Sequence, residues 1–419
     1  MHRRGLLERV HRESWGRLLG GLIARTGRAD LAEDALAEAF AAAAAQWPTD
    51  GEPRNPEGWL MTTARRRVLD AIRAEGTLRA KAHLLASAEV IDHATDQVTV
   101  DSDALAPDDD DRLRLLLLAT HPALAPESRA ALALRFVLGV PTEQIARLFL
   151  VPTPTMAARL TRAKKRITAA GLPFAMPADA ELPERIDDVA RAILLAFTAG
   201  YAPGDEHVVR IDVAGEAVRL ATVAHGAMPA AEVFTALTAL VTLQHSRRAA
   251  RCRGDDAGGD LVLLEHQDRT LWHHDEIERG LTLLAMLEPG TGYREELRLQ
   301  AVIAAVHAMA PTARDTDWAM IARAYRRLEA LTGSPIVRLN RAVALAEVQG
   351  PQAGLALLQA VSEALPDHHR VSLARAEFLR RDGLLTEAAQ AYETALTQCP
   401  PGAEYRHIEA RLRELNSPT

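Results

Sequence analysis

The sequence predicts an all-α protein, because apolar residues recur at helical spacing along most of its 419 residues. Between residues 6 and 85, two apolar stripes of this kind lie on either side of a Pro-containing loop at 48–56. Only at 249–264 does the pattern favour another structure, a short β-hairpin around a Gly- and Asp-rich turn. The two stripes consist of Leu31, Ala35, Ala39, Ala43 and Trp47, and of Leu60, Ala64, Val68 and Ile72.

The length suggests two to three domains at about 100 to 200 residues each. Residues 86–111 carry nine acidic side chains, no basic one and no visible period, which is typical of an extended linker. We therefore expect small helical domains at 1–85 and 112–175 on either side of an acidic linker. A helical connecting domain at 176–290 and a helical repeat domain at 291–419 complete the predicted organisation.

Helix pairs dominate the last part of the chain. Gly350 and Gly383 are 33 residues apart, and the spacing after Gly383 approaches that of tetratricopeptide (TPR) repeats, with small and aromatic residues at the expected offsets. Generic antiparallel helix packing remains an alternative, and either arrangement offers a surface for contacts. The expected pairs are 295–309 with 315–331, 334–349 with 351–364, and 367–382 with 386–398, followed by a capping helix at 402–415.

Charge is distributed unevenly. The net charge is −7, yet residues 1–175 hold 24 Lys or Arg against 22 Asp or Glu, whereas residues 176–419 hold 25 against 34. The basic surplus on both sides of the acidic linker favours nucleic-acid binding there. We hypothesise that the acidic second half docks on these basic blocks and restrains them, because complementary charges attract at short range.

A helix-turn-helix is predicted at 142–167. The segment 153–167 carries five basic residues and no acidic one, and it follows a shorter apolar helix at 142–150 and a Pro-marked turn. Thr153 is a suitable N-cap and Pro154 suits the first turn. An apolar stripe of Met156, Leu160, Ala163 and Ile167 leaves Arg162, Lys165 and Arg166 facing outward, as in a helix that enters the major groove. The alternative is a solvated basic helix.

The first domain combines arginines with aromatic residues. The helix at 64–75 contains Arg65, Arg66, Arg67 and Arg73, and Trp47 and Trp59 flank the preceding loop. Such a combination suits unstacked bases, which bind cations along their backbone and stack on aromatic rings. Trp59 could equally belong to the core. The preceding helix exposes carboxylates that could dock on a basic protein partner or simply be solvated.

Catalysis, metals and membranes are not indicated. The sequence lacks a Walker loop, HExxH, GxSxG, CxxC and a dinucleotide-binding glycine motif, so we expect no enzyme, no cofactor and no metal. Cys252 and Cys399 are too few for a disulfide framework or a zinc site. Because no apolar run approaches about 18 residues, we expect a cytoplasmic protein without membrane contact.

The first 170 residues resemble extracytoplasmic-function (ECF) sigma factors, which are bacterial transcription initiation factors. The resemblance rests on three motifs in the family's order: DLAEDALAEAF at 30–40, NPEGWLMTTARRRVLDAIRAE at 55–75 and VPTEQIARLFLVPTPTMAARLTRAKKRI at 140–167. The remainder resembles the TPR-like extension of one subgroup, through LLEHQDRTLWHHDEI at 263–277, HAMAPTARDTDW at 307–318 and SPIVRLNRAVALAE at 334–347.

This resemblance implies three sets of site residues. The domain at 1–85 would be sigma region 2, which docks on core RNA polymerase and binds the minus-ten element, and 112–175 would be sigma region 4, which binds the minus-thirty-five element. The implied polymerase contacts are Asp30, Glu33, Asp34, Leu36, Glu38 and Phe40; the minus-ten contacts are Asn55, Trp59, Arg65, Arg66, Arg67 and Arg73; the minus-thirty-five contacts are Thr153, Thr155, Ala158, Arg159, Arg162, Lys165 and Arg166.

We therefore expect a sigma factor that binds core polymerase and promoter DNA, with a regulatory protein or peptide as a further partner of the extension. A stand-alone helix-turn-helix regulator with a TPR sensor is the main rival, and it would bind DNA tightly without polymerase. An enzyme acting on nucleic acid is a third candidate, which the missing catalytic motifs disfavour.

Overall fold

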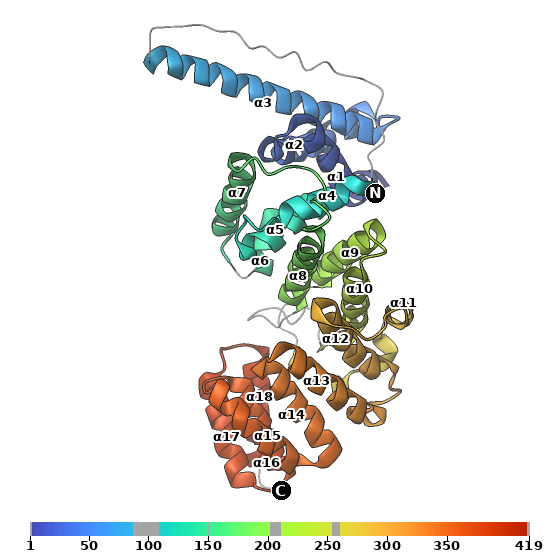
Figure 1. The fold of residues 1–419 in the computed structure, drawn as a ribbon, viewed down its shortest axis with the longest axis vertical. Helices are drawn as coiled ribbons and strands as arrows, with labels where there is room; N and C mark the ends of the chain where they lie inside the picture. Colours follow the sequence, from blue (N-terminus) through green and yellow to red (C-terminus); the bar gives the residue numbers. More distant parts are fainter. Residues whose placement is uncertain (1, 87–108, 150, 202–210, 254–259, 417–419) are drawn as a thin grey trace. The chain divides into compact units, whose positions relative to one another are not determined.

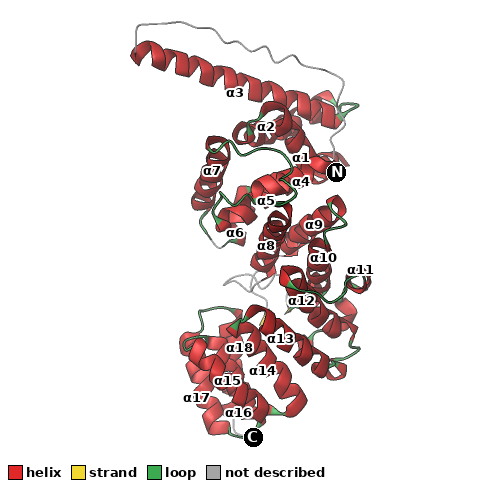
Figure 2. Ribbon diagram, in the orientation of Figure 1, coloured by secondary structure: helices red, strands yellow, loops and turns green. Residues whose placement is uncertain are grey.

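The computed structural model describes residues 2–86, 109–149, 151–201, 211–253 and 260–416. The chain divides into two compact units, residues 1–192 and 193–419. Helices form nearly all regular structure of the described residues (Figure 2), which confirms the all-α prediction. Most of the predicted linker, residues 87–108, lies outside the described residues.

The described residues of the first unit form the helices α1 to α7 and the start of α8 (Figure 1). One boundary differs from expectation: the second helix continues through Pro48 to Asp50. The loop between the second and third helices therefore narrows to residues 51–55. The helices are α1 His2–Thr26, α2 Ala29–Asp50, α3 Pro56–Ala86, α4 Asp109–Ala119, α5 Pro126–Leu138, α6 Thr142–Leu148, α7 Thr153–Ala169 and α8 Leu182–Tyr201.

The expected apolar stripes of α2 and α3 form part of the core of this unit. Ala35, Ala39, Ala43 and Trp47 are buried, and so are Leu60, Ala64 and Val68 of α3, whereas Leu31 and Ile72 at the ends of the stripes are half-buried. Periodicity alone thus located the contact between these two helices.

Helix α1 contacts helices that precede the predicted linker in the sequence, α2 and α3, and helices that follow it, α4 and α5. Glycines make this possible. A β-carbon at Gly16 would lie 2.5 Å from the carbonyl oxygen of Val137 in α5, and one at Gly20 would lie 2.9 Å from the side chain of Asp111 in α4. The two predicted small domains are therefore parts of one compact unit.

The second unit begins within α8 and continues with a layer around α10, most of whose residues are buried. The expected hairpin is present and short, with Cys252 paired to Leu261 and Arg253 to Asp260 in antiparallel register. The elements are α9 Ile211–Ala227, α10 Glu232–His245, η1 Arg248–Ala250, β1 Cys252–Arg253, β2 Asp260–Leu261, η2 Leu264–His266, η3 Arg269–Leu271, α11 His274–Ala285, α12 Gly292–Met309 and η4 Ala313–Asp315.

The predicted helix pairs follow as α13 Trp318–Thr332, α14 Pro335–Gln349, α15 Pro351–Ala364, α16 His369–Arg381, α17 Leu385–Gln398 and α18 Ala403–Asn416. The TPR-like spacing has a structural basis in the last pair. Gly383 has a φ of +83°, and Ala388, Tyr392 and Ala395 are fully buried between the helices. Gly354 of α15 lies so close to Phe378 of α16 that a β-carbon would approach the ring to 2.6 Å.

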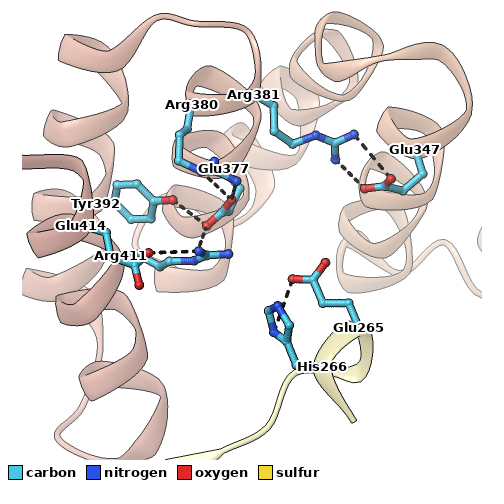
Figure 3. A network of polar contacts seen from close by, with 9 residues as sticks. All are labelled: Glu265, His266, Glu347, Glu377, Arg380, Arg381, Tyr392, Arg411 and Glu414. Carbon is cyan, nitrogen blue, oxygen red and sulfur yellow. Dashed lines mark hydrogen bonds and ion pairs between the residues drawn. The ribbon is translucent and has the colours of Figure 1, made fainter. Parts of the chain in front are cut away.

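Polar contacts connect these repeat helices on one side (Figure 3). Glu377 of α16 accepts hydrogen bonds from Tyr392 of α17, at 2.5 Å, and from Arg380, at 2.9 Å, and it forms an ion pair with Arg411 of α18, at 3.4 Å. Arg381 of α16 forms an ion pair with Glu347 of α14. These contacts connect α14, α16, α17 and α18 to one another.

Candidate nucleic-acid interface

Helix α7 presents its basic side chains as expected. The stripe of Met156, Leu160, Ala163 and Ile167 is buried. Of the predicted contacts, Thr155, Ala158, Arg162, Lys165 and Arg166 are exposed, and Thr153 and Arg159 are half-buried at the border of the face. The helix therefore has one face in the core and one cationic face in solvent.

The cationic face is available for an anion. Within the described part of the chain, Arg159, Arg162, Lys165 and Arg166 have no ion pair or side-chain hydrogen bond. Three of them, Arg159, Arg162 and Arg166, line a groove of about 350 Å³ together with residues 123–125 and with Glu127 and Ser128 in the first turn of α5. Free guanidinium groups beside a helix N-terminus are well suited to phosphate oxygens.

The turn before α7 is tight. The amide of Val151 donates to the carbonyl of Ala146, and α7 begins at Thr153 with Pro154 in its first turn. The N-cap is Pro152, and Thr153 makes no capping hydrogen bond. The expectation of Thr153 as N-cap is thus wrong by one position, because Pro152 has the extended backbone angles of a cap (φ −57°, ψ 142°) and Thr153 is already the first helical residue.

Some of the predicted minus-ten residues contact other parts of the protein, and others have no side-chain partner among the described residues. Asn55 caps α3, since its side-chain oxygen accepts from the amide of Gly58 at 2.9 Å. The Trp59 ring is half-buried and lies edge-on against the Trp47 ring, with 5.6 Å between the ring centroids. The two rings are therefore part of the contact between α2 and α3. Arg65 and Arg66 have no side-chain partner among the described residues.

Two further arginines of α3 are engaged in ion pairs. Arg67 contacts Glu38 of α2, and Arg73 contacts Asp70 at 3.1 Å within its own helix. The Arg73 pair is largely exposed and therefore contributes little to stability, so it does not prevent Arg73 from meeting a phosphate. Of the predicted set, Arg65 and Arg66 thus have the freest guanidinium groups.

The carboxylates of α2 are mostly bound within the chain. Asp30 accepts two hydrogen bonds from Arg28, at 2.9 and 2.8 Å, and Arg28 also reaches Glu75 of α3, at 2.9 Å. Burial alone would raise the pKa of Asp30, but Arg28 outweighs burial and lowers it. Arg28 therefore stabilises the start of α2 against α3.

Glu33 and Asp34 contact the helices that follow the linker. Lys164 of α7 donates to Glu33 at 2.9 Å and to Asp34 at 2.8 Å, and Arg135 of α5 forms an ion pair with Glu33. Burial alone would raise the pKa of Glu33, yet Arg135 and Lys164 outweigh burial and hold it below its usual value. Sequence analysis did not single out Lys164 or Arg135, although Lys164 directly follows a residue of the buried stripe.

Leu36 and Phe40, two of the predicted polymerase contacts, lie in the core. Leu36 is completely buried, and the ring of Phe40 packs against His11 at 4.9 Å and Trp15 at 5.6 Å between centroids. Both side chains belong to the inner face of α2, where apolar area is removed from water. The exposed carboxylates among the predicted contacts of α2 are those of Asp34 and Glu38, whose side chains are 64% and 60% exposed.

Family models match the parts of the chain in which these features lie. Residues 13–77 match "Sigma-70 region 2", and residues 114–167, which end in α7, match "Sigma-70, region 4". The chain is a sigma-70 family protein. Residues 185–287 match a family of unknown function, DUF6596. Two sigma-70 regions followed by this further domain fit an ECF-type sigma factor with a C-terminal extension.

The sequence of one relative is similar to this chain over nearly its whole length. An uncharacterized protein of Rhizobium meliloti (strain 1021) is 38% identical over 402 residues, which are 95% of this chain and 93% of the relative. Among solved structures, the TPR domain of P58(IPK) aligns over 95% of this chain and 96% of its own length, at 16% identity and a TM-score of 0.25. That score is too low to establish a shared fold.

The sites of this sigma-70 protein are suited to binding. Cations of α7 and α3 without a partner among the described residues lie at the surface, and Asp34 of α2 is 64% exposed. Among the residues that the structure describes, no group of three or more His, Cys, Asp or Glu could hold a metal ion. No helix of the described ranges is both long and apolar enough to cross a membrane.

Proposed function

We propose that this protein is an ECF-type RNA polymerase sigma factor that directs promoter recognition, with a regulatory C-terminal extension. The observation that carries the proposal is the solvent-facing side of α7, where Arg159, Arg162, Lys165 and Arg166 have no partner among the described residues. In a helix-turn-helix, such a face enters the major groove, where arginines contact base edges and phosphates. The matched sigma-70 regions agree with this role.

The other two helices have separate tasks in this proposal. Arg65 and Arg66 of α3 contact the backbone of the melted minus-ten strand, for which they have free guanidinium groups. Asp34 and Glu38 of α2 contact a basic surface of core polymerase. None of these steps is a covalent reaction, and sigma factor families are not enzymes.

The extension supplies regulation in the same proposal. Helices α13 to α18 form helix pairs with a network of polar contacts around Glu377, and stacked pairs of this kind present surfaces suited to a protein or peptide partner. We place this activity in the cytoplasm, where polymerase and promoter DNA are found.

Run-off transcription with purified core polymerase tests the proposal. We expect promoter-dependent transcripts only when the full chain is added, and sequencing of their 5′ ends identifies both promoter elements. A protein that binds the same DNA tightly without polymerase, and that yields no transcript, would be the stand-alone regulator instead.

A further inference from the structure

Two adjacent helices of the second unit, α13 and α14, are basic although this half of the chain is acidic. They hold five arginines and two glutamates, whereas residues 176–419 as a whole hold 25 Lys or Arg against 34 Asp or Glu. One of the two glutamates, Glu347, is bound to Arg381 of α16. Because α13 and α14 pack against each other (Figure 1), their arginines give one part of the repeat a surplus of positive charge.

The solvent-facing side of α13 carries arginines without partners. Ile321, Ala324 and Leu328 are buried at helical spacing, so the opposite side of the helix faces outward. Arg323 and Arg326 are exposed on that side, and neither has an ion pair or a hydrogen bond among the described residues. Residues three positions apart are neighbours on a helix surface, so the two guanidinium groups offer adjacent donors.

The acidic residue of α13 lies at the contact with α14. Glu329 is 12% exposed and accepts hydrogen bonds from Arg338 at 2.7 Å and from Arg341 at 2.5 Å. Because two guanidinium groups share one carboxylate, a positive charge remains there. Arg327 contacts the buried Glu295 at 3.1 Å, yet its own side chain is 50% exposed. We call this set the arginine patch: Arg323, Arg326, Arg327, Arg338 and Arg341.

Exposed apolar side chains lie next to the arginine patch. Met320 is one helical turn before Arg323, and Leu331 is one turn after Arg327. An acidic peptide with apolar residues would satisfy both kinds of side chain, since carboxylates bind guanidinium groups and apolar side chains lose contact with water. Clusters of arginine are a known means of recognising acidic motifs.

The surroundings of the patch favour a peptide over a nucleic acid. A DNA duplex is long, and its phosphates would be repelled by the net negative charge of residues 176–419. A short peptide interacts mainly with charges within about 8 Å at physiological salt. Single-stranded nucleic acid would need exposed rings for stacking, but Trp318 and Tyr325 of α13 pack against the core between α12 and α13.

We propose that the arginine patch binds an acidic peptide segment of a partner protein, with carboxylates on the guanidinium groups and apolar side chains against Met320 and Leu331. This inference rests on the proposed function, in which the extension binds a protein or peptide, and it gives that role a surface and a ligand chemistry. Arg323 and Arg326 are the central cations of the site, because they give up no other partner when the peptide binds.

Selection of peptides on the full chain tests the proposal without knowledge of the partner. A phage-displayed library of short random peptides is selected on the wild-type protein. We expect the enriched sequences to be rich in Asp and Glu and to contain large apolar residues. Enrichment of neutral or basic sequences, or no enrichment, would overturn the proposal.

A double variant, Arg323→Gln with Arg326→Gln, locates the binding of the selected peptides. Neither arginine holds another residue in place, so the variant should fold. Arg375→Gln is a matched control, because Arg375 is exposed on α16 of the same unit and contacts only Ser362, at 3.5 Å. We expect the peptides to bind the double variant about three- to thirtyfold more weakly, since two exposed charge pairs are lost, and to bind the control like the wild type. Equal binding to all three proteins, each shown to be folded by circular dichroism, would refute the assignment.

Hydrogen–deuterium exchange of the wild-type chain needs no variant and so remains valid if the double variant fails to fold. We expect a selected peptide to slow exchange in α13 and α14, and protection confined to other helices would contradict the proposal. A duplex of random sequence tests the alternative ligand: weaker duplex binding by the double variant, with unchanged peptide binding, would make the patch a DNA contact instead. These measurements contain neither polymerase nor promoter, so their failure is distinguishable from that of run-off transcription, which tests the proposed function.

Discussion

The packing of α1 against α5 makes a sharp prediction about Gly139. This residue ends α5 with a φ of +68°, and a β-carbon on it would lie 2.7 Å from two atoms of the Trp15 ring and 2.8 Å from His11. Gly139→Ala therefore combines two costs. A left-handed backbone angle costs a non-glycine residue about 1 to 2 kcal/mol, and overpacking against a buried ring costs about 1 to 3 kcal/mol more.

Gly171 provides a matched control for the backbone term. It follows α7 with a φ of +58°, and a β-carbon on it would meet no heavy atom of the described residues within 4 Å. Gly171→Ala should therefore lose only about 1 to 2 kcal/mol. The difference between the two variants isolates the contact between Gly139 and Trp15.

Urea unfolding followed by circular dichroism and tryptophan fluorescence measures both variants. We expect Gly139→Ala to lower the free energy of unfolding by about 1 to 3 kcal/mol more than Gly171→Ala does. Equal losses would show that α1 and α5 do not pack this closely in solution. The contact between Gly139 and Trp15 would then not join the two sigma regions into one unit.

If Arg162 contacts a base, Arg162→Ala should weaken transcription from promoters by about 1 to 3 kcal/mol, measured on templates with different minus-thirty-five sequences. Arg326→Ala, which removes an exposed arginine of α13, is the control. Unchanged transcription from every template would exclude Arg162 from the site. Burial and the nearby Arg247 and Arg269 lower the pKa of His307 to about 4, so its neutral form stabilises the fold above pH 6.5 and this contribution is lost between pH 6.5 and about 4. Thermal unfolding of His307→Gln should show a smaller loss over that range, and identical pH profiles would refute the assignment. A chain ending at residue 180 should be less stable than one ending at 201, because α8 contacts the first unit: Arg185 donates to the carbonyl of Leu117, and Asp188 forms an ion pair with Arg129 at 3.3 Å. Equal melting temperatures of the two chains would show that these contacts of α8 do not stabilise the unit. If the acidic half restrains DNA binding, the chain ending at 201 should also bind promoter DNA more tightly than the full chain, and equal affinities would reject that restraint.

Helical periodicity determined much of this protein from the sequence alone. The buried stripe of α7 and the helix pairs from α12 onward were predictable because each depends on residues three or four positions apart. The cationic face of α7 followed from the same stripe, since the side chains left outside it are basic. Pro48 and Thr153 show the limit of local rules, because a helix can continue for a few residues after a proline and a cap can move by one position.

Only the tertiary structure decided which charged residues are free. In the sequence, Lys164 is one of five basic residues on α7 and Glu33 one of several carboxylates on α2, separated by 131 positions. Their contact depends on how α2 packs against α7 within the unit in which α1 also packs closely against α5 at Gly16 and Gly139. Such close approaches are long-range and leave no period in the sequence. For the same reason, the burial of Leu36 and Phe40 required the structure, because an apolar residue in a motif can face either a partner or the core.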